Sequence, residues 1–168
     1  MLPSRRRYLS YYIVGLVDGE GCFSISVKKQ DNTRFGWVID PVFHVSQRKE
    51  GLAVLQVLRR FFNCGRIIPK PGQDETMIQY VVDARKHLAE KIIPFFMKHK
   101  PIIKWHAFHS FAEIVEALER GEHRSPEGFR KLVEKAYALS QDRKHTLDEI
   151  LYELRKRVDA SETIRWSP

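Results

Sequence analysis

The chain contains only two cysteines, Cys22 and Cys64, and no apolar run that approaches the 18 or more residues of a membrane span. The cysteines lie far apart and match no metal-ligand spacing, which argues against a zinc site or a disulfide framework and favours a reducing compartment. The N-terminal segment lacks the apolar core of a secretory signal. The sequence therefore predicts a cytoplasmic protein with no membrane-spanning segment, and the matrix of an organelle is the alternative location.

Internal repeats, low-complexity tracts and long linkers are also missing. A chain of 168 residues with 43% hydrophobic content can bury one substantial core, so we expect a single domain spanning residues 1–168. Acidic residues are in the minority: 29 Lys and Arg stand against 21 Asp and Glu, which gives a net charge of +8. A basic excess of this size favours a polyanionic partner such as nucleic acid.

Hydrophobic periodicity divides the chain into helices and strands. Apolar and polar side chains alternate along two neighbouring segments, as in half-buried strands, and Pro41 in the second predicts a bulge or a strand edge. Pro94 is expected to end one helix, and Pro101 to open the next. The predicted strands are 22–30, 37–45, 65–70 and 77–83, and the predicted helices after the N-terminal one are 51–62, 84–93, 101–118, one starting at 126, and 146–158.

The N-terminal helix ends on an unusual string, Tyr-Tyr-Ile-Val-Gly-Leu-Val-Asp-Gly-Glu-Gly-Cys-Phe at 11–23. Its apolar residues have helical spacing, while Gly15 and Gly19 lie four residues apart and leave one strip almost free of side chains. A glycine inside a helix costs about 1 kcal/mol relative to alanine, so two of them indicate close approach of another backbone. The helix then places a carboxylate, Glu20, between two glycines.

This string resembles the LAGLIDADG motif of homing endonucleases, with residues 13–21 in the place of the nine-letter signature. The resemblance implies an α+β fold in which an αββαββα core carries a saddle-shaped antiparallel sheet, followed here by additional C-terminal helices. It also implies site-specific, metal-dependent cleavage of both strands of a long, roughly palindromic DNA site. Glu20 stands at the metal-binding acid position, where many members carry Asp.

The resemblance further identifies candidate catalytic residues. Glu20 and its neighbour Gly19 are the predicted metal-binding residues, and Mg²⁺ is the implied cofactor because it accepts hard oxygen ligands and keeps several waters. Gln47, at the end of the second strand, matches a polar residue that orients the nucleophilic water. Lys104 is the best match for a basic residue that stabilises charge at the phosphate, and Lys100 is the alternative.

The signature occurs once in the chain, which predicts a homodimer whose two motif helices meet on a two-fold axis. The predicted interface residues are Ile13, Gly15, Leu16, Asp18 and Gly19. A concave sheet with one polar face can enter the DNA major groove, where all four base pairs are distinguishable. The predicted DNA-binding residues on that face are Ser24, Ser26, Lys28, Gln30, Asp40, His44, Arg66, Lys70 and Gln79.

A second function fits the same resemblance. A protein that kept this fold but lost cleavage would act as a maturase on intron RNA or as a DNA-binding regulator. An acid at the crowded helix end favours the endonuclease, because a protein that only binds has no need of it. An enzyme that is also a maturase remains compatible with the sequence.

Overall fold

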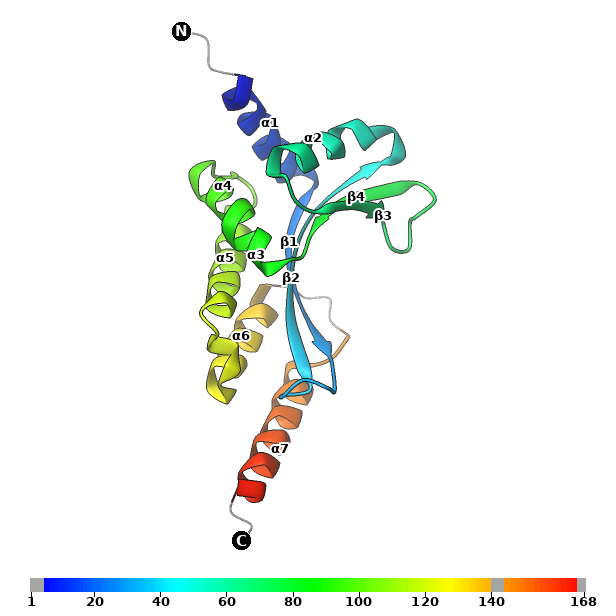
Figure 1. The fold of residues 1–168 in the computed structure, drawn as a ribbon. Coiled ribbons are helices and arrows are strands. Elements are labelled where there is room, and N and C mark those ends of the chain that lie inside the picture. The colour runs from blue at the N-terminus through cyan, green and yellow to red at the C-terminus, as the bar shows by residue number, and fades with distance from the viewer. Residues whose placement is uncertain (1–4, 140–143, 166–168) are drawn as a thin grey trace.

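The structure is a computed structural model that describes the backbone of residues 5–139 and 144–165. One four-stranded antiparallel sheet, in the order β1-β2-β4-β3, organises it (Figure 1). None of the helices described in these ranges is long and apolar enough to cross a membrane. The elements are α1 (Arg5–Glu20), β1 (Gly21–Lys29), β2 (Trp37–Arg48), the 3-10 turn η1 (Lys49–Gly51), α2 (Leu52–Phe62), β3 (Arg66–Pro69), β4 (Met77–Val82), α3 (Arg85–His87), the π-helical η2 (Leu88–Ile92), α4 (Ile93–Lys98), α5 (Trp105–Glu119), the 3-10 turn η3 (Glu122–Arg124), α6 (Pro126–Leu139) and α7 (Leu147–Arg165).

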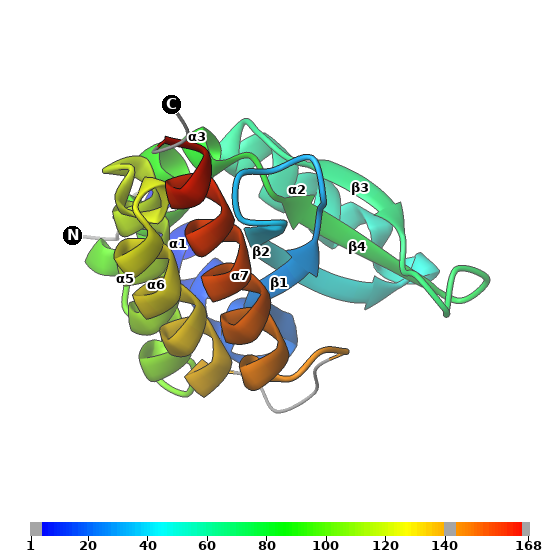
Figure 2. The same cartoon turned by 90° about the horizontal axis from the view of Figure 1, so that it is seen from below.

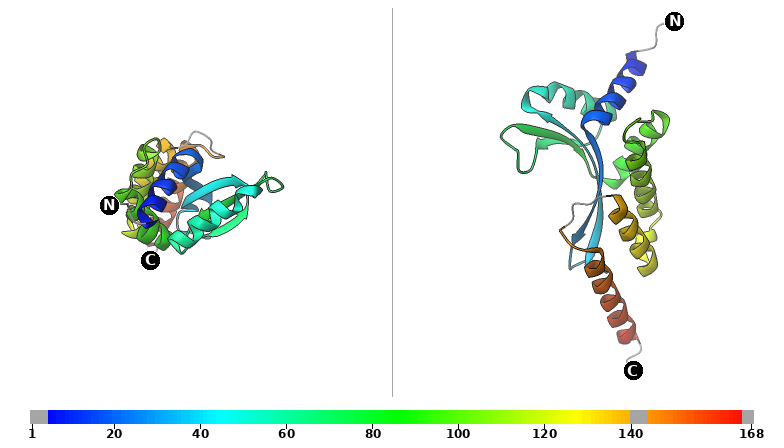
Figure 3. Two further views of the ribbon diagram at one scale, coloured as in Figure 1. Left: turned by 90° about the horizontal axis from the view of Figure 1, so that it is seen from above. Right: turned by 180° about the vertical axis from the view of Figure 1, so that it is seen from behind.

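The helices lie on the convex side of the sheet, and its concave side, on the right in Figure 1, carries no described helix. Helices α5, α6 and α7 lie side by side when the molecule is seen from below (Figure 2). Seen from behind, α1 and α7 stand at opposite ends of the curved sheet (Figure 3). The expected αββαββα order, saddle-shaped sheet and additional C-terminal helices are confirmed.

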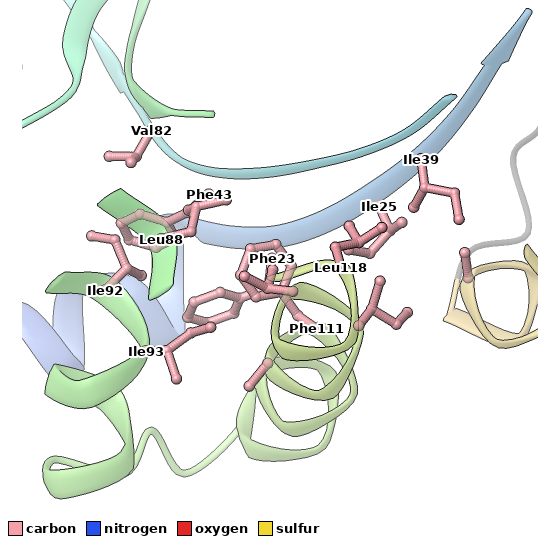
Figure 4. Packing of buried hydrophobic residues seen from close by; sticks show 14 of the residues in the cluster. Phe23, Ile25, Ile39, Phe43, Val82, Leu88, Ile92, Ile93, Phe111 and Leu118 are labelled. Carbon is pink, nitrogen blue, oxygen red and sulfur yellow. The ribbon is translucent and has the colours of Figure 1, made fainter. Parts of the chain in front are cut away.

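Strand alternation produces the core. The register of β1 on β2 runs without interruption from Gly21 opposite Val45 to Lys29 opposite Trp37, so odd-numbered residues of both strands share one face. Phe23 and Phe43 project from that face toward Phe111 of α5 (Figure 4), and the Phe23 ring lies 5.1 Å from the Phe43 ring and 5.5 Å from the Phe111 ring. The aromatic cluster anchors α5 to the sheet.

Pro41 lies in β2 without a bulge. It pairs in register with Ile25 of β1, while pairing of β2 with β4 begins only at Phe43, opposite Val82. Along residues 37–42, β2 therefore has β1 as its only neighbour in the sheet. A proline, which has no backbone N–H, is tolerated there because it lies at a local edge of the sheet. Of the two alternatives predicted from the sequence, the strand edge is confirmed and the bulge is wrong.

This two-stranded part of the sheet is held by α7. The indole N–H of Trp37 donates to Glu153 over 3.0 Å, and the amine of Lys29 donates to the same carboxylate over 2.8 Å. In the turn between the strands, Arg157 pairs with Asp31 at 2.9 Å. Three polar contacts thus tie the tip of the β1–β2 hairpin to the last helix.

Two predicted helix boundaries are wrong. Pro94 does not end a helix, because the π-helical turn η2 precedes it and α4 continues through it. A wider turn of this kind relieves the clash between the proline ring and the preceding turn. Pro101 does not open a helix either: α5 begins at Trp105, and residues 99–104 before it form an irregular segment with bends.

Two glycines have nearly the same left-handed backbone but different surroundings. Substituting each by alanine separates the cost of the backbone conformation from the cost of a steric clash. Gly65 has φ +74°, and a Cβ there would lie 2.6 Å from the carbonyl oxygen of Val81, whereas Gly72 has φ +76° and open space. We expect Gly72→Ala to lower the free energy of unfolding by about 1 kcal/mol, and Gly65→Ala to lower it by about 3 kcal/mol or more. Urea unfolding followed by circular dichroism measures both, and equal losses would contradict this assignment.

Candidate active site and nucleic-acid interface

The junction between α1 and β1 places the candidate acid. Gly21 is buried, and a Cβ at this position would lie 2.8 Å from the carbonyl oxygen of Val17, so only glycine allows the chain to leave the helix and enter the sheet at once. Glu20 is therefore the last helical residue and is exposed. Within the described part of the chain, no hydrogen bond or ion pair involves its carboxylate.

Asp18, two residues earlier, is fully engaged. Its carboxylate accepts the backbone N–H groups of Ile102 at 2.7 Å, Ile103 at 3.1 Å and Lys104 at 3.1 Å. Lys104 is the N-cap residue of α5, and Ile102 and Ile103 come before it, so the carboxylate binds the backbone of the segment that leads into the helix. Asp18 therefore ties the start of α5 to the end of α1.

The side chain of Lys104 reaches back to the same junction. Its amine donates to the carbonyl oxygen of Gly21, the residue after Glu20. Lys100, the alternative, lies elsewhere: its amine is 4.8 Å from the centre of the Trp105 ring. Of the two lysines, only Lys104 contacts the end of the motif helix.

Gln47 lies at the level of that helix end. Gly21 pairs with Val45, so Gln47 extends β2 two residues past the start of β1. Its side chain packs on η1, where a Cβ at position 51 would lie 3.0 Å from its Oε1, so glycine leaves it room. Glu20, Gln47 and Lys104 thus come from three separate segments and gather at one end of the sheet.

The predicted DNA-binding residues share the concave face, with one exception. Register pairs Ser26 with Asp40, His44 with Val81, and Val81 with Arg66, and the Lys70 N–H continues the ladder to Met77. Gln30 lies beyond β1 in the hairpin turn, where its N–H donates to Gly36. Continued alternation of the strands also identifies face residues that were not predicted: Cys22, Val42, Ser46, Arg48, Ile68 and Met77.

Several of the polar groups on this face are already paired within the protein. The guanidinium of Arg66 donates to both carboxylate oxygens of Asp83 at 2.7 and 2.6 Å, which lowers the pKa of that carboxyl, and Lys28 pairs with Asp40. Gln79 donates to Ser46 at 2.9 Å. The amine of Lys70 has no ion-pair partner among the described residues. The concave face is therefore a prearranged polar surface with some free positive charge.

His44 connects this face to the candidate active site. Burial lowers its pKa, and the nearby positive charges of Lys70 and Lys104 lower it further. Burial also raises the pKa of the Cys22 thiol, its cross-strand neighbour, against the opposing effect of Lys104. His44 is consequently a neutral hydrogen-bonding group at neutral pH.

The outer face of α1 is only partly as predicted. Gly15 and Gly19 are exposed, and a Cβ at either would meet nothing within 4 Å. Tyr8 and Tyr12 flank them, each about half exposed. Ile13 has 0% exposure and belongs to the chain's own core, so it offers no surface to a partner, and Leu16 is half-buried against that core. The stripe Tyr8, Tyr12, Gly15 and Gly19 is called the outer stripe below.

Comparison with known proteins agrees with this architecture. The chain is 34% identical to the archaeal intron-encoded homing endonuclease I-Vdi141I, whose structure was determined in complex with DNA; the TM-score is 0.85, covering 92% of this chain and 99% of that one. It also superposes on the structure of I-TnaI, with a TM-score of 0.74, 30% identity, and coverage of 88% and 97%. The fold is therefore that of a homing endonuclease.

Sequence comparison leads to the same family. The model of the LAGLIDADG endonuclease family matches residues 13–115, and homing endonuclease I-ApeII of Aeropyrum pernix is 39% identical over 150 residues, which are 85% of this chain and 88% of that protein. DNA endonuclease I-CeuI of Chlamydomonas moewusii is 38% identical over 88 residues, which are 52% of this chain and 40% of that protein. The chain belongs to the LAGLIDADG endonuclease family, as its motif predicted.

The electrostatics of the concave face can be tested by NMR titration of His44. We expect its pKa to lie below the ordinary value of about 6.5, and Lys70→Ala to raise it because one positive charge is removed. The pKa should stay below the ordinary value even in this variant, since burial is the largest cause of the shift. Lys86→Ala, on α3, is the matched control and should leave His44 unchanged; a lowered pKa in the Lys70 variant would contradict the assignment.

Proposed function

We propose that this protein is a homodimeric, site-specific homing endonuclease that cleaves both strands of a long, roughly palindromic DNA site. The observation that carries the proposal is the exposed carboxylate of Glu20, which has no partner among the described residues and precedes Gly21, whose carbonyl binds Lys104, at the end of a concave polar sheet. Each protomer would supply one such acid and one such sheet. The DNA complex of I-Vdi141I, which matches nearly the whole chain, supports the choice of duplex DNA as substrate.

The outer stripe supports assembly around a two-fold axis. Its two glycines have no neighbours within the protomer, so a second helix can approach α1 closely there. Tyr8 and Tyr12 add exposed aromatic surface, of the type that is enriched in interfaces. Two copies of α1 crossing at this stripe bring both Glu20 residues toward the axis, one for each DNA strand.

A divalent metal fits the chemistry of this end of the helix. Glu20 offers unpaired hard oxygen ligands, but the described residues contain no cluster of three or more His, Cys, Asp or Glu side chains. Mg²⁺ suits such a site because it needs only one or two carboxylates, with phosphate oxygens and water as its other ligands. Glu20, together with the adjacent backbone of Gly19, would hold it. When bound, Mg²⁺ supplies an activated water and neutralises charge at the scissile phosphate.

The other two groups have separate roles. The amide of Gln47, which makes no hydrogen bond among the described residues, is available to orient the attacking water. The positive charge of Lys104, fixed at the Gly21 carbonyl, would stabilise negative charge that develops on the phosphate. Lys100 is the weaker candidate, because its amine lies over the Trp105 ring.

Glu20→Gln tests the catalytic part of the proposal. The substitution keeps the size of the side chain and removes its charge, so DNA binding should persist while cleavage falls by about 10²-fold or more. The assay first selects duplexes bound in Ca²⁺ from a random library, and then incubates the recovered DNA in Mg²⁺ with wild type and variant.

Glu50→Gln, an exposed acid on η1, is the control and should cleave like wild type. Selected DNA that is bound tightly but cut by neither wild type nor control would overturn the endonuclease proposal. It would favour the alternative, a LAGLIDADG-fold protein that binds DNA or intron RNA without cleavage.

Gly15→Leu tests the dimer separately. A Cβ at Gly15 would have no described neighbour within 4 Å, the position is exposed, and the change improves helix propensity by about 1 kcal/mol, so the protomer should stay folded. It would nevertheless block the close crossing of two helices. Sedimentation equilibrium should show a dimer for wild type and for Gly72→Ala, and a folded monomer for Gly15→Leu. A dimeric Gly15→Leu would place the interface elsewhere.

A further inference from the structure

Asp18 makes three hydrogen bonds across 84 to 86 residues of sequence, all to one short loop. Both of its carboxylate oxygens are used, and all three donors belong to the segment that leads into α5. A carboxylate at this place also interacts favourably with the N-terminal end of the 15-residue helix. The loop is thereby held to α1 by its backbone, independently of its side chains.

Lys104 is the last residue of this loop and is fixed at both ends. Its N–H is bound by Asp18, and its amine is bound by the carbonyl of Gly21. Asp18 and Gly21 flank Glu20 on the two sides of the same helix end. Contacts within one protomer therefore fix the position of Lys104, the candidate lysine for stabilising charge at the phosphate, relative to the helix end that carries Glu20.

The same loop presents two apolar side chains to solvent. Ile102 and Ile103 are 87% and 78% exposed, the highest values among the large apolar residues described. Their backbone N–H groups are bound to Asp18, which lies three residues from Gly15 and next to Gly19, so the isoleucines stand beside the outer stripe. An apolar pair that continues a proposed interface fits a second copy of this chain.

We propose that Asp18 is a positioning residue with two effects: it fixes Lys104 relative to Glu20, and it holds Ile102 and Ile103 where a second copy covers them. The proposal rests on the proposed function, since it assigns Lys104 a role in cleavage. The carboxylate of Asp18 is bound by three backbone N–H groups, so its role in this proposal is to hold other residues in place. Dimer assembly and the position of Lys104 thus both depend on the carboxylate of Asp18.

The first test needs no DNA. Asp18→Asn keeps the shape of the side chain but removes its charge and replaces one acceptor with a donor. Amide hydrogen exchange, measured by NMR, should become about ten- to a hundredfold faster at Ile102, Ile103 and Lys104, while amides of β2 keep their rates. Unchanged exchange at the three amides would overturn the proposal.

The second test separates positioning from general stability. Single-turnover cleavage at saturating DNA is measured for Asp18→Asn, Lys104→Ala and the double variant. We expect Asp18→Asn to slow cleavage at least about tenfold with DNA affinity unchanged, and to have almost no further effect once Lys104 is absent. Full additivity of the two losses would show that Asp18 acts by another route. Asp148→Asn, an exposed acid on α7, is the control and should cleave normally.

The third test concerns the partner. The double substitution Ile102→Ser with Ile103→Ser should weaken self-association at least about tenfold in sedimentation equilibrium, because two exposed apolar side chains lose their cover. Tyr152→Ser, which removes another exposed apolar side chain on α7, should not. An unchanged dimer would remove the second effect from the proposal. If wild type fails to cut DNA, the proposed function fails, and the exchange and sedimentation results still decide the role of Asp18.

Discussion

The structure depends on the absence of a side chain at Gly21. At this residue the chain passes from α1 into β1 without a loop, and the space for a Cβ is taken by Val17 of the preceding turn. The consequence is a fixed relation between helix and sheet: the acid that ends α1 and the first residue of the concave surface are neighbours in sequence. A longer connection would allow the candidate catalytic end and the candidate DNA-binding surface to move independently.

Around this junction, the chemistry is assembled from segments that are remote in sequence. Glu20 comes from α1, Gln47 from the far end of β2, and Lys104 from the start of α5. The sheet register sets the first two relative to each other, and backbone hydrogen bonds to Asp18 set the third. The fold therefore holds the three candidate groups in a fixed arrangement, which is what the proposed catalysis by positioning and electrostatics requires.

Much of this could be predicted from the sequence, because the signals are local. Period-two alternation identified the strands and placed all but one of the predicted DNA-binding residues on the concave face, and the glycine-acid-glycine string identified the motif helix. Contacts that join distant segments leave no such signal: the residues around Asp18 do not indicate that it binds the segment before α5. The helix end predicted at Pro94 is wrong because a π-helical turn accommodates this proline. Ile13 was predicted to lie in the interface, but it is buried in the core of the protomer. The residues of the outer stripe and those of the buried face alternate along the same helix, so the sequence does not separate them clearly.

Because β2 has a free edge near Pro41, the last helix, α7, influences the orientation of the β1–β2 hairpin. A hairpin of two strands is only marginally stable alone, and this one owes its orientation to Glu153 and Arg157 of α7. That helix lies beyond residues 13–115, which the family model matches, and it carries no candidate catalytic group. Changes in α7 would therefore tilt one wing of the saddle and alter how far along a duplex the concave face extends, while every residue of that face stays the same.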